Sequence, residues 1–233
     1  MAASIAHNEA TKIGRVLDRF TSGLVDRVVV VDDASTDETP AIASQKGAVV
    51  LTHARRAGAG AAIRTAIKYA MAEGFDVVVI LAGNDKDRPA EIERLLGPMA
   101  DAGYDFVQGS RYLKGGDFGN MPFYRQIATR YVHPLLFSLF AGRRFTDTTN
   151  GFRAIRLSAL ADTRIDLDQA WLDHYELEPY VFFKMHRLGY KVTEVPVTKI
   201  YPQHELGYTK MKPITGWWSI LRPLFLLGLG FKR

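Results

Sequence analysis

Short apolar runs rich in valine alternate along this chain with longer segments whose apolar residues recur at helical spacing. Such runs are typical of buried strands, and such segments are typical of amphipathic helices. The pattern predicts strands at residues 4–7, 28–32, 48–52, 77–81 and 106–109, separated by helices at residues 10–21, 39–46, 60–73 and 89–102. Alternating strands and helices indicate an α/β fold, with a Rossmann-like, mainly parallel sheet flanked by helices.

The second half of the chain is less regular. It predicts a helix at residues 123–140 that bends at Pro134, a helix at 178–188 and a last strand at 192–200. The glycine-rich segment "YLKGGDFGNMP", which begins at Tyr112, is expected to act as a lid.

Polar side chains follow the predicted strands at their carboxyl ends, where open parallel sheets bind ligands. These side chains are Asn8 and Glu9, Asp32 and Asp33, Arg55 and Arg56, the stretch "GNDKD" from Gly83, and Ser110 with Arg111. Hydrogen-bonding and charged groups at five strand ends predict a polar, phosphorylated ligand.

The composition narrows the function classes. The chain has 233 residues, 47% hydrophobic and 24% charged, and no linker, so we expect one globular domain over residues 1–233. The absence of cysteine excludes disulfides, thiolate metal sites and cysteine nucleophiles. The net charge of +5 is spread along the chain, so nucleic acid is not an expected partner. No P-loop motif occurs, and "RAGAGAAI" has Ile63 where a dinucleotide fingerprint requires a small residue.

The C-terminal stretch "WWSILRPLFLLGLGF" is too short and too interrupted to span a bilayer. It is either a buried helix or an amphipathic segment, at about residues 213–231, that lies in a membrane interface. In the second interpretation the paired tryptophans lie at headgroup depth and basic residues face anionic lipid. The protein is then cytoplasmic and peripheral at the cytoplasmic face of a membrane.

Six sequence blocks in order resemble the family 2 glycosyltransferases with a GT-A fold, and most closely the dolichyl- or polyprenyl-phosphate mannosyl- and glucosyltransferases. The blocks are "HNEATKIGRVLDRF", "VVVVDDASTDET", "RAGAGAAIRTAI", "QGSRYL", "DTTNGFRAI" and "VTEVPV". The resemblance covers nearly the entire chain. It implies an inverting enzyme that moves a hexose from GDP-mannose or a UDP-sugar to a polyprenyl or dolichyl phosphate.

The resemblance also implies roles for individual residues. The donor nucleotide would be contacted by Ala6, Asn8, Glu9, Asp33, Arg56, Gly58, Gly60, Ala82, Gly83 and Asn84. Arg111 and Arg125 would hold the acceptor phosphate, and Lys210 would lie beside the transferring phosphates. The acceptor side would further include Asp147, Asn150, Arg153 and Glu178, with Asn150 replacing the serine usual in the family. Glu178 is equally compatible with a helix start.

The stretch "LAGNDKDRP" departs from the family, which normally has D-x-D after this strand to hold a divalent cation against the donor diphosphate. Alignment on Pro89 places Ala82 and Asn84 at those positions. Three hypotheses remain. Mg²⁺ or Mn²⁺ is held by a shifted set of Asn84, Asp85 and Asp87, with the two aspartates catalytic; or Lys86 and Arg88, helped by Lys210, neutralise the diphosphate directly; or the loop only caps the next helix.

Two alternative functions stay open at this point. One is transfer to a soluble or glycan acceptor, and the other is a non-catalytic protein that binds sugar nucleotides. The sequence does not indicate an oligomeric state.

Overall fold

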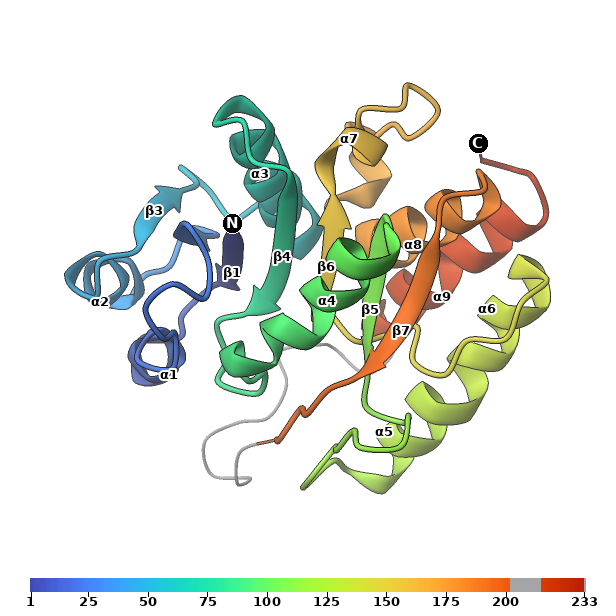
Figure 1. Cartoon of the computed structure of the whole chain (residues 1–233), viewed down its shortest axis with the longest axis horizontal. Coiled ribbons are helices and arrows are strands. Elements are labelled where there is room, and N and C mark those ends of the chain that lie inside the picture. Colours follow the sequence, from blue (N-terminus) through green and yellow to red (C-terminus); the bar gives the residue numbers. More distant parts are fainter. Residues whose placement is uncertain (202–214, 233) are drawn as a thin grey trace.

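The computed structural model describes residues 1–201 and 215–232. Its seven strands form one sheet in the order β3-β2-β1-β4-β6-β5-β7 (Figure 1). The strands are β1 (Ala2–Ala6), β2 (Val28–Asp32), β3 (Val49–Thr52), β4 (Val77–Ala82), β5 (Phe106–Ser110), β6 (Arg153–Arg156) and β7 (Val192–Pro196). Strand β6 runs antiparallel to both neighbours, and the other six strands run in one direction. The predicted α/β fold with a mainly parallel sheet is confirmed.

Consecutive residues of each strand point to opposite faces, and both faces are buried. In β2, Val29 and Val31 belong to one apolar core while Val30 belongs to another. In β4, Val78 and Ile80 belong to the same core as Val29 and Val31, whereas Val79 and Leu81 pack on the opposite side of the sheet. Burial on both faces explains why these strands read as continuous valine runs.

Helices cover both faces of the sheet (Figure 1). One face carries α3 (Ala59–Ala72), α6 (His133–Ala141), α7 (Leu157–Leu160), α8 (Leu177–Arg187) and α9 (Thr215–Gly228). The other face carries α1 (Ala10–Leu17), α2 (Thr39–Gln45) and α4 (Ile92–Ala102), with the 3₁₀ turn η1 (Pro89–Glu91) before α4. A further 3₁₀ turn, η3 (Ala170–Leu172), precedes α8.

The helix predicted at residues 123–140 is divided into three pieces. Helix α5 (Phe123–Ile127) leads into a π-helical turn, η2 (Ala128–Val132), which leads into α6. Pro134 lies in the first turn of α6 and has no N–H to donate to the preceding turn, so the wider π turn precedes it. The structure thus has a π-helical turn directly before the turn that contains Pro134, and the bend at Pro134 stays a prediction.

The C-terminal helix α9 packs into the core rather than lying wholly exposed. Ile220, Leu224 and Leu227 are buried against α6 and α8, whereas Trp218 and Phe231 are exposed. The structure thus favours the buried-helix interpretation for the inner face of this segment. No helix in the described ranges combines the length and apolarity needed to cross a bilayer.

The glycine-rich segment after Tyr112 is tied down by backbone hydrogen bonds to the chain that follows β7. Asp117 N donates to Val197 O at 3.1 Å, and Lys199 N donates back to Asp117 O at 2.9 Å. Tyr201 N donates to Gly119 O at 2.9 Å. The segment is thus paired with the chain that follows β7. These contacts do not support the expectation that it acts as a lid.

Candidate active site

Asp33 organises the donor side of the site. It follows β2, is 4% exposed, and accepts hydrogen bonds at Oδ1 from Ala57 N at 2.7 Å and at Oδ2 from Gly58 N at 2.9 Å. His53 Nδ1 also lies 2.9 Å from Oδ1. Burial opposes ionisation, but these three donors hold the pKa of Asp33 below its usual range. The carboxylate therefore fixes the loop between β3 and α3 at the sheet edge.

Two glycines let this loop pack tightly. Gly58 has φ +106°, a conformation that favours glycine, and a Cβ there would collide with His174 Nδ1. A Cβ at Gly60 would overlap the carbonyl oxygen of Leu172. Close packing inside the protein thus explains why both positions are glycine. Arg56, which lies between β3 and α3, is exposed.

The loop after β1 closes the same edge. Ala6 O accepts a hydrogen bond from Asp33 N at 2.9 Å, which joins the ends of β1 and β2. Asn8 has φ +51°, and its Oδ1 accepts from Thr36 N at 2.8 Å. Glu9 is 7% exposed and lies 3.1 Å from Lys12 Nζ. The predicted donor residues at three strand ends are therefore brought together.

The loop after β4 does not present its carboxylates as a metal site. Asp85, at φ +63°, turns toward α1 and pairs with Arg15 at 2.8 Å and Arg19 at 2.6 Å. Asp87 is 1% exposed, and its Oδ1 lies 2.6 Å from Lys199 Nζ. Asn84 Oδ1 is buried and has no hydrogen-bond partner in the described chain. It could therefore supply one neutral oxygen ligand to a metal ion.

Within the described ranges, no group of three or more histidine or acidic side chains is arranged to hold a metal ion. Nearby positive charge also opposes a cation. The described residues do not fit the divalent cation expected from the family, and the set Asn84, Asp85 and Asp87 stays a prediction.

Lys86 has other basic side chains around it, and a further one reaches the Tyr201 side chain that Lys86 contacts. We call these five the cationic cluster: Lys12, Lys86, Lys199, Arg111 and Arg125. Three of the five contact the side chain of Tyr201. Lys86 Nζ is 4.6 Å and Arg125 Cζ is 5.6 Å from its ring centroid, and Arg111 Nη1 donates to its hydroxyl at 3.2 Å.

Lys86 is the most deeply placed of the lysines in this cluster, at 6% exposed. Burial, followed by the charges of Lys199 and Arg125, lowers its pKa to about 7. Lys12 adds to this lowering of the pKa, and the charge of Asp87 opposes it. A bound phosphate group would raise the pKa of Lys86 again and favour the charged lysine.

Arg111 is held by Asp147 in a bidentate pair. Nε lies 2.6 Å from Oδ2 and Nη2 lies 2.7 Å from Oδ1, with both residues buried. Nη2 also donates to Thr149 Oγ1 at 2.8 Å. Burial alone would lower the pKa of Arg111, but the carboxylate of Asp147 raises it above its usual value. Most of the guanidinium is thus already bonded within the protein.

The remaining acceptor-side residues hold the junction of β5, β6 and α8. Asn150 Nδ2 donates to Gly109 O at 3.0 Å and is fully buried. Arg153 Nη2 lies 3.0 Å from Glu178 Oε1, in the first turn of α8. Burial lowers the pKa of Arg153, and Glu178 opposes that change.

An apolar stripe extends from Arg125 along α5, η2 and α6. Its exposed members recur at helical spacing, and they are Phe123, Tyr124, Ile127, Tyr131, Val132, Leu135 and Leu139. Leu135 and Leu139 are 70% and 71% exposed. Arg125 Nε is buried and has no hydrogen-bond partner in the described residues. A basic group in need of an acceptor thus lies at the head of an exposed apolar helix face.

The pattern of strand ends did not reveal Tyr201, Lys199 or Lys12. Lys199 and Tyr201 come after β7, which ends at Pro196. The chain that follows β7 runs along the loop after β4, where Asp87 and Lys199 form an isolated β-bridge, and this pairing places both residues at the site. The predicted Lys210 lies outside the described residues.

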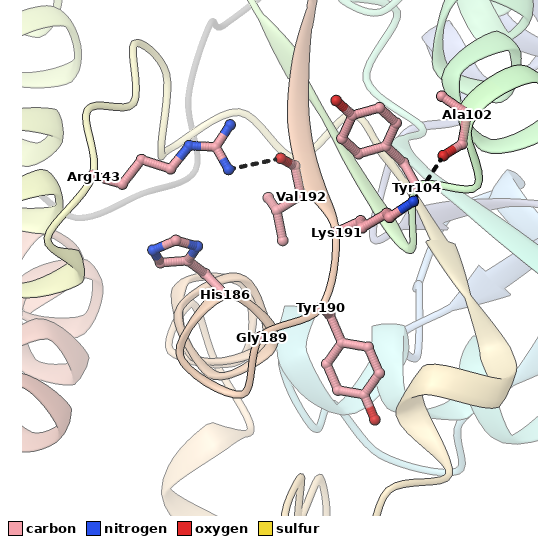
Figure 2. A pocket seen from close by; sticks show the side chains of 8 residues that line it. All are labelled: Ala102, Tyr104, Arg143, His186, Gly189, Tyr190, Lys191 and Val192. Atoms are coloured by element: carbon pink, nitrogen blue, oxygen red, sulfur yellow. Dashed lines mark hydrogen bonds between the residues drawn. The ribbon is translucent and has the colours of Figure 1, made fainter.

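A hollow near the amino-terminal ends of β5 and β7 is not part of this site (Figure 2). It is lined by Ala102, Tyr104, Arg143, His186, Gly189, Tyr190, Lys191 and Val192. Arg143 donates to Val192 O at 3.0 Å, and Lys191 Nζ donates to Ala102 O at 3.4 Å (Figure 2). These cations are bonded to backbone carbonyls at the start of β7 and at the end of α4.

The model of the family described as Glycosyl transferase family 2 matches residues 3–164. The undecaprenyl-phosphate mannosyltransferase of Micrococcus luteus is 32% identical over 211 residues, which cover 88% of this chain and 84% of the relative. The dolichyl-phosphate hexose transferase of Haloferax volcanii is 33% identical over 214 residues, covering 90% and 85%.

Among solved structures, glucosyl-3-phosphoglycerate synthase from Mycobacterium tuberculosis, with Mn²⁺, UDP and glucosyl-3-phosphoglycerate, matches with a TM-score of 0.69 at 22% identity. The match covers 100% of this chain and 80% of that one. At this identity the likeness shows the GT-A fold alone.

Proposed function

This chain belongs to glycosyl transferase family 2 and is a glycosyltransferase, and from that premise we propose that it transfers a hexose from a nucleoside diphosphate sugar to a polyprenyl phosphate. The names of the two relatives support a phosphorylated isoprenoid acceptor and a hexose. The UDP in the solved neighbour supports a nucleoside diphosphate donor, with GDP-mannose and UDP-sugars as the candidates.

The observation that carries this proposal is the position of Arg125. Its buried Nε has no partner within the described chain, and the exposed apolar stripe begins beside it. A lipid phosphate has the same two parts, an anion and an apolar chain. The arginine would bind the phosphate by charge-assisted hydrogen bonds, and the isoprenoid would follow the stripe.

The proposed reaction is a single displacement with inversion. An oxygen of the acceptor phosphate forms a bond to the anomeric carbon of the sugar. The bond from that carbon to the diphosphate breaks on the opposite face, and its electron pair leaves with the diphosphate. The acceptor phosphate is already ionised at neutral pH, so no general base is needed. Arg125, with Arg111 steadied by Asp147, orients this nucleophile.

The same stripe is the proposed membrane contact. Because α9 buries Ile220, Leu224 and Leu227, most of the large exposed apolar side chains in the described ranges lie on α5, η2 and α6. Trp218 adds to this apolar surface, since the start of α9 lies beside the start of α6, where His133 Nε2 is 3.2 Å from Ile220 O. The protein would bind the cytoplasmic face peripherally, with the acceptor phosphate drawn toward Arg125.

A transfer assay tests this function. Purified protein is incubated with radiolabelled GDP-mannose or UDP-glucose and with a short polyprenyl phosphate, 3-phosphoglycerate or a soluble glycan. The proposal predicts a labelled, solvent-extractable product with the polyprenyl phosphate only. Transfer only to a water-soluble acceptor would contradict the proposed acceptor, and nucleotide binding without any transfer would contradict catalysis.

A further inference from the structure

The position of Lys86 suggests what replaces the missing metal ligands of this site. Lys86 follows β4, whose carboxyl end is joined to that of β1 by the hydrogen bond from Gly83 N to Ile5 O, 2.8 Å long. The backbone carbonyl of Lys86 accepts a hydrogen bond from Ile200 N at 3.0 Å. The residue is therefore fixed between the donor edge of the sheet and the segment that carries Tyr201.

The Tyr201 side chain connects Lys86 to the acceptor side. The ring contacts the Lys86 ammonium on the donor side and the Arg125 guanidinium on the acceptor side. Its hydroxyl accepts from Arg111. In the proposed reaction, a cation in the position of Lys86 would therefore be close to the phosphate groups of both the donor and the acceptor.

The two nearby carboxylates have structural partners instead of a metal. Asp85 is bound by two arginines of the α1 region, and Asp87 is bound by Lys199 and by Ala82 N, which donates to its Oδ2 at 3.2 Å. Asp87 thereby fixes both ends of the loop that carries Lys86. The acids position a lysine, whereas in a metal site they would be ligands.

We propose that the ammonium of Lys86, supported by the rest of the cationic cluster, binds the donor diphosphate and stabilises it as the leaving group in place of a divalent cation. This inference rests on the proposed function for the identity of the leaving group. No proton is transferred to or from Lys86 in the step. The ammonium stays charged and offsets the negative charge that the diphosphate gains when the bond to the sugar breaks.

Calorimetric titration of the full chain with nucleotides tests the inference without any acceptor. GDP and UDP are titrated in EDTA and again with Mn²⁺, beside GMP and UMP. At least one diphosphate is expected to bind with the same dissociation constant, within about threefold, in both conditions. Lys86→Gln is expected to weaken that diphosphate by about 10- to 100-fold, the usual effect of one charge-assisted hydrogen bond. The matching monophosphate should change by less than about threefold.

Two variants make the result specific. Lys86→Arg keeps the charge and should retain most of the affinity for the diphosphate. Lys46→Gln removes a surface lysine that pairs with Asp18, and should change nothing. A melting curve for each variant confirms that it is folded.

Three results would overturn the inference: diphosphate binding that is lost in EDTA and restored by Mn²⁺, equal weakening of mono- and diphosphates by Lys86→Gln, or no binding of either diphosphate in any condition. If binding follows the expectation but no transfer to polyprenyl phosphate occurs, the inference stands and the proposed acceptor fails.

Discussion

At the scale of single residues, the site depends on which charges are already paired inside the protein. Asp33, Asp87 and Asp147 all use their carboxylates to hold loops or basic side chains at the sheet edge. Arg125 and Lys86 both contact the ring of Tyr201, and the proposed function assigns phosphate binding to them. Acids therefore hold this end of the sheet together, and the basic residues are the proposed ligands of the phosphate groups.

Replacement of Asp85 by asparagine separates the metal hypothesis from the one proposed here. Asparagine tolerates the φ of +63° at this position, and the partners Arg15 and Arg19 are 52% and 46% exposed. We expect a loss of up to about 1 kcal/mol in the free energy of unfolding and a change in transfer rate below about threefold. Urea unfolding and the transfer assay measure both. A loss of rate of 100-fold or more would identify Asp85 as a metal ligand.

Replacement of Asp147 by asparagine should affect stability far more. It leaves the guanidinium of Arg111 buried without its counter-ion, which costs about 3–5 kcal/mol. Urea denaturation measures the change, with Asp168→Asn as the control, because that side chain is 62% exposed and pairs with Lys68 on the surface. Equal, small effects of the two substitutions would show that the buried pair does not stabilise the fold.

At the scale of elements, the strands and their carboxyl ends could be predicted because local pattern determines them. Valine-rich runs flanked by turn residues predicted β2, β3 and β4, and the polar residues after them lie at the carboxyl end of the sheet. The antiparallel β6 was not predicted, since its four residues, Arg153–Arg156, include two arginines and show no strand pattern.

The partners of Asp85 and Asp87 could not be predicted for a physical reason. Arg15 is 70 residues from Asp85, and Lys199 is 112 residues from Asp87. Spacing along the chain carries no information about such contacts, which form only when the sheet brings distant loops together. The sequence therefore located the polar edge but left the choice between metal and lysine open.

The apolar stripe on α6 gives a prediction that compares two elements. Leu135→Asp with Leu139→Asp places charges on the stripe, and Phe231→Asp places one on the C-terminal segment. We expect the double variant to lose binding to vesicles that contain anionic lipid, because charged side chains are costly at membrane depth. The Phe231 variant should bind nearly as well as the wild type. Flotation of protein with vesicles measures this, and the reverse order would assign the contact to the C-terminal segment.

At the scale of the whole molecule, His133 couples the stability of the fold to pH. It is fully buried between α6 and α9, with Nδ1 2.7 Å from Thr148 Oγ1 and Nε2 3.2 Å from Ile220 O. Burial lowers its pKa from 6.5 to about 4, although the Ile220 carbonyl and the charge of Asp147 oppose the shift. The folded protein therefore keeps this histidine neutral.

Between pH 6.5 and pH 4 the unfolded chain binds a proton at this histidine that the folded chain does not. Stability is therefore present above that range and falls as the pH falls through it. We expect His133 to lower the free energy of unfolding by about 3 kcal/mol at pH 4 relative to pH 8. His133→Gln should flatten this dependence in urea titrations across the range. An unchanged pH profile in the variant would assign the effect to other groups.

The most direct measurement of the central claim is a crystal structure of the full chain with a nucleoside diphosphate, grown in the presence of Mn²⁺. The account predicts the nucleotide at the edge organised by Asp33, its terminal phosphate within hydrogen-bond distance of Lys86 Nζ, and Asp85 and Asp87 still paired with their basic partners. A manganese ion bridging the diphosphate to Asn84, Asp85 or Asp87, with Lys86 turned away, would contradict it.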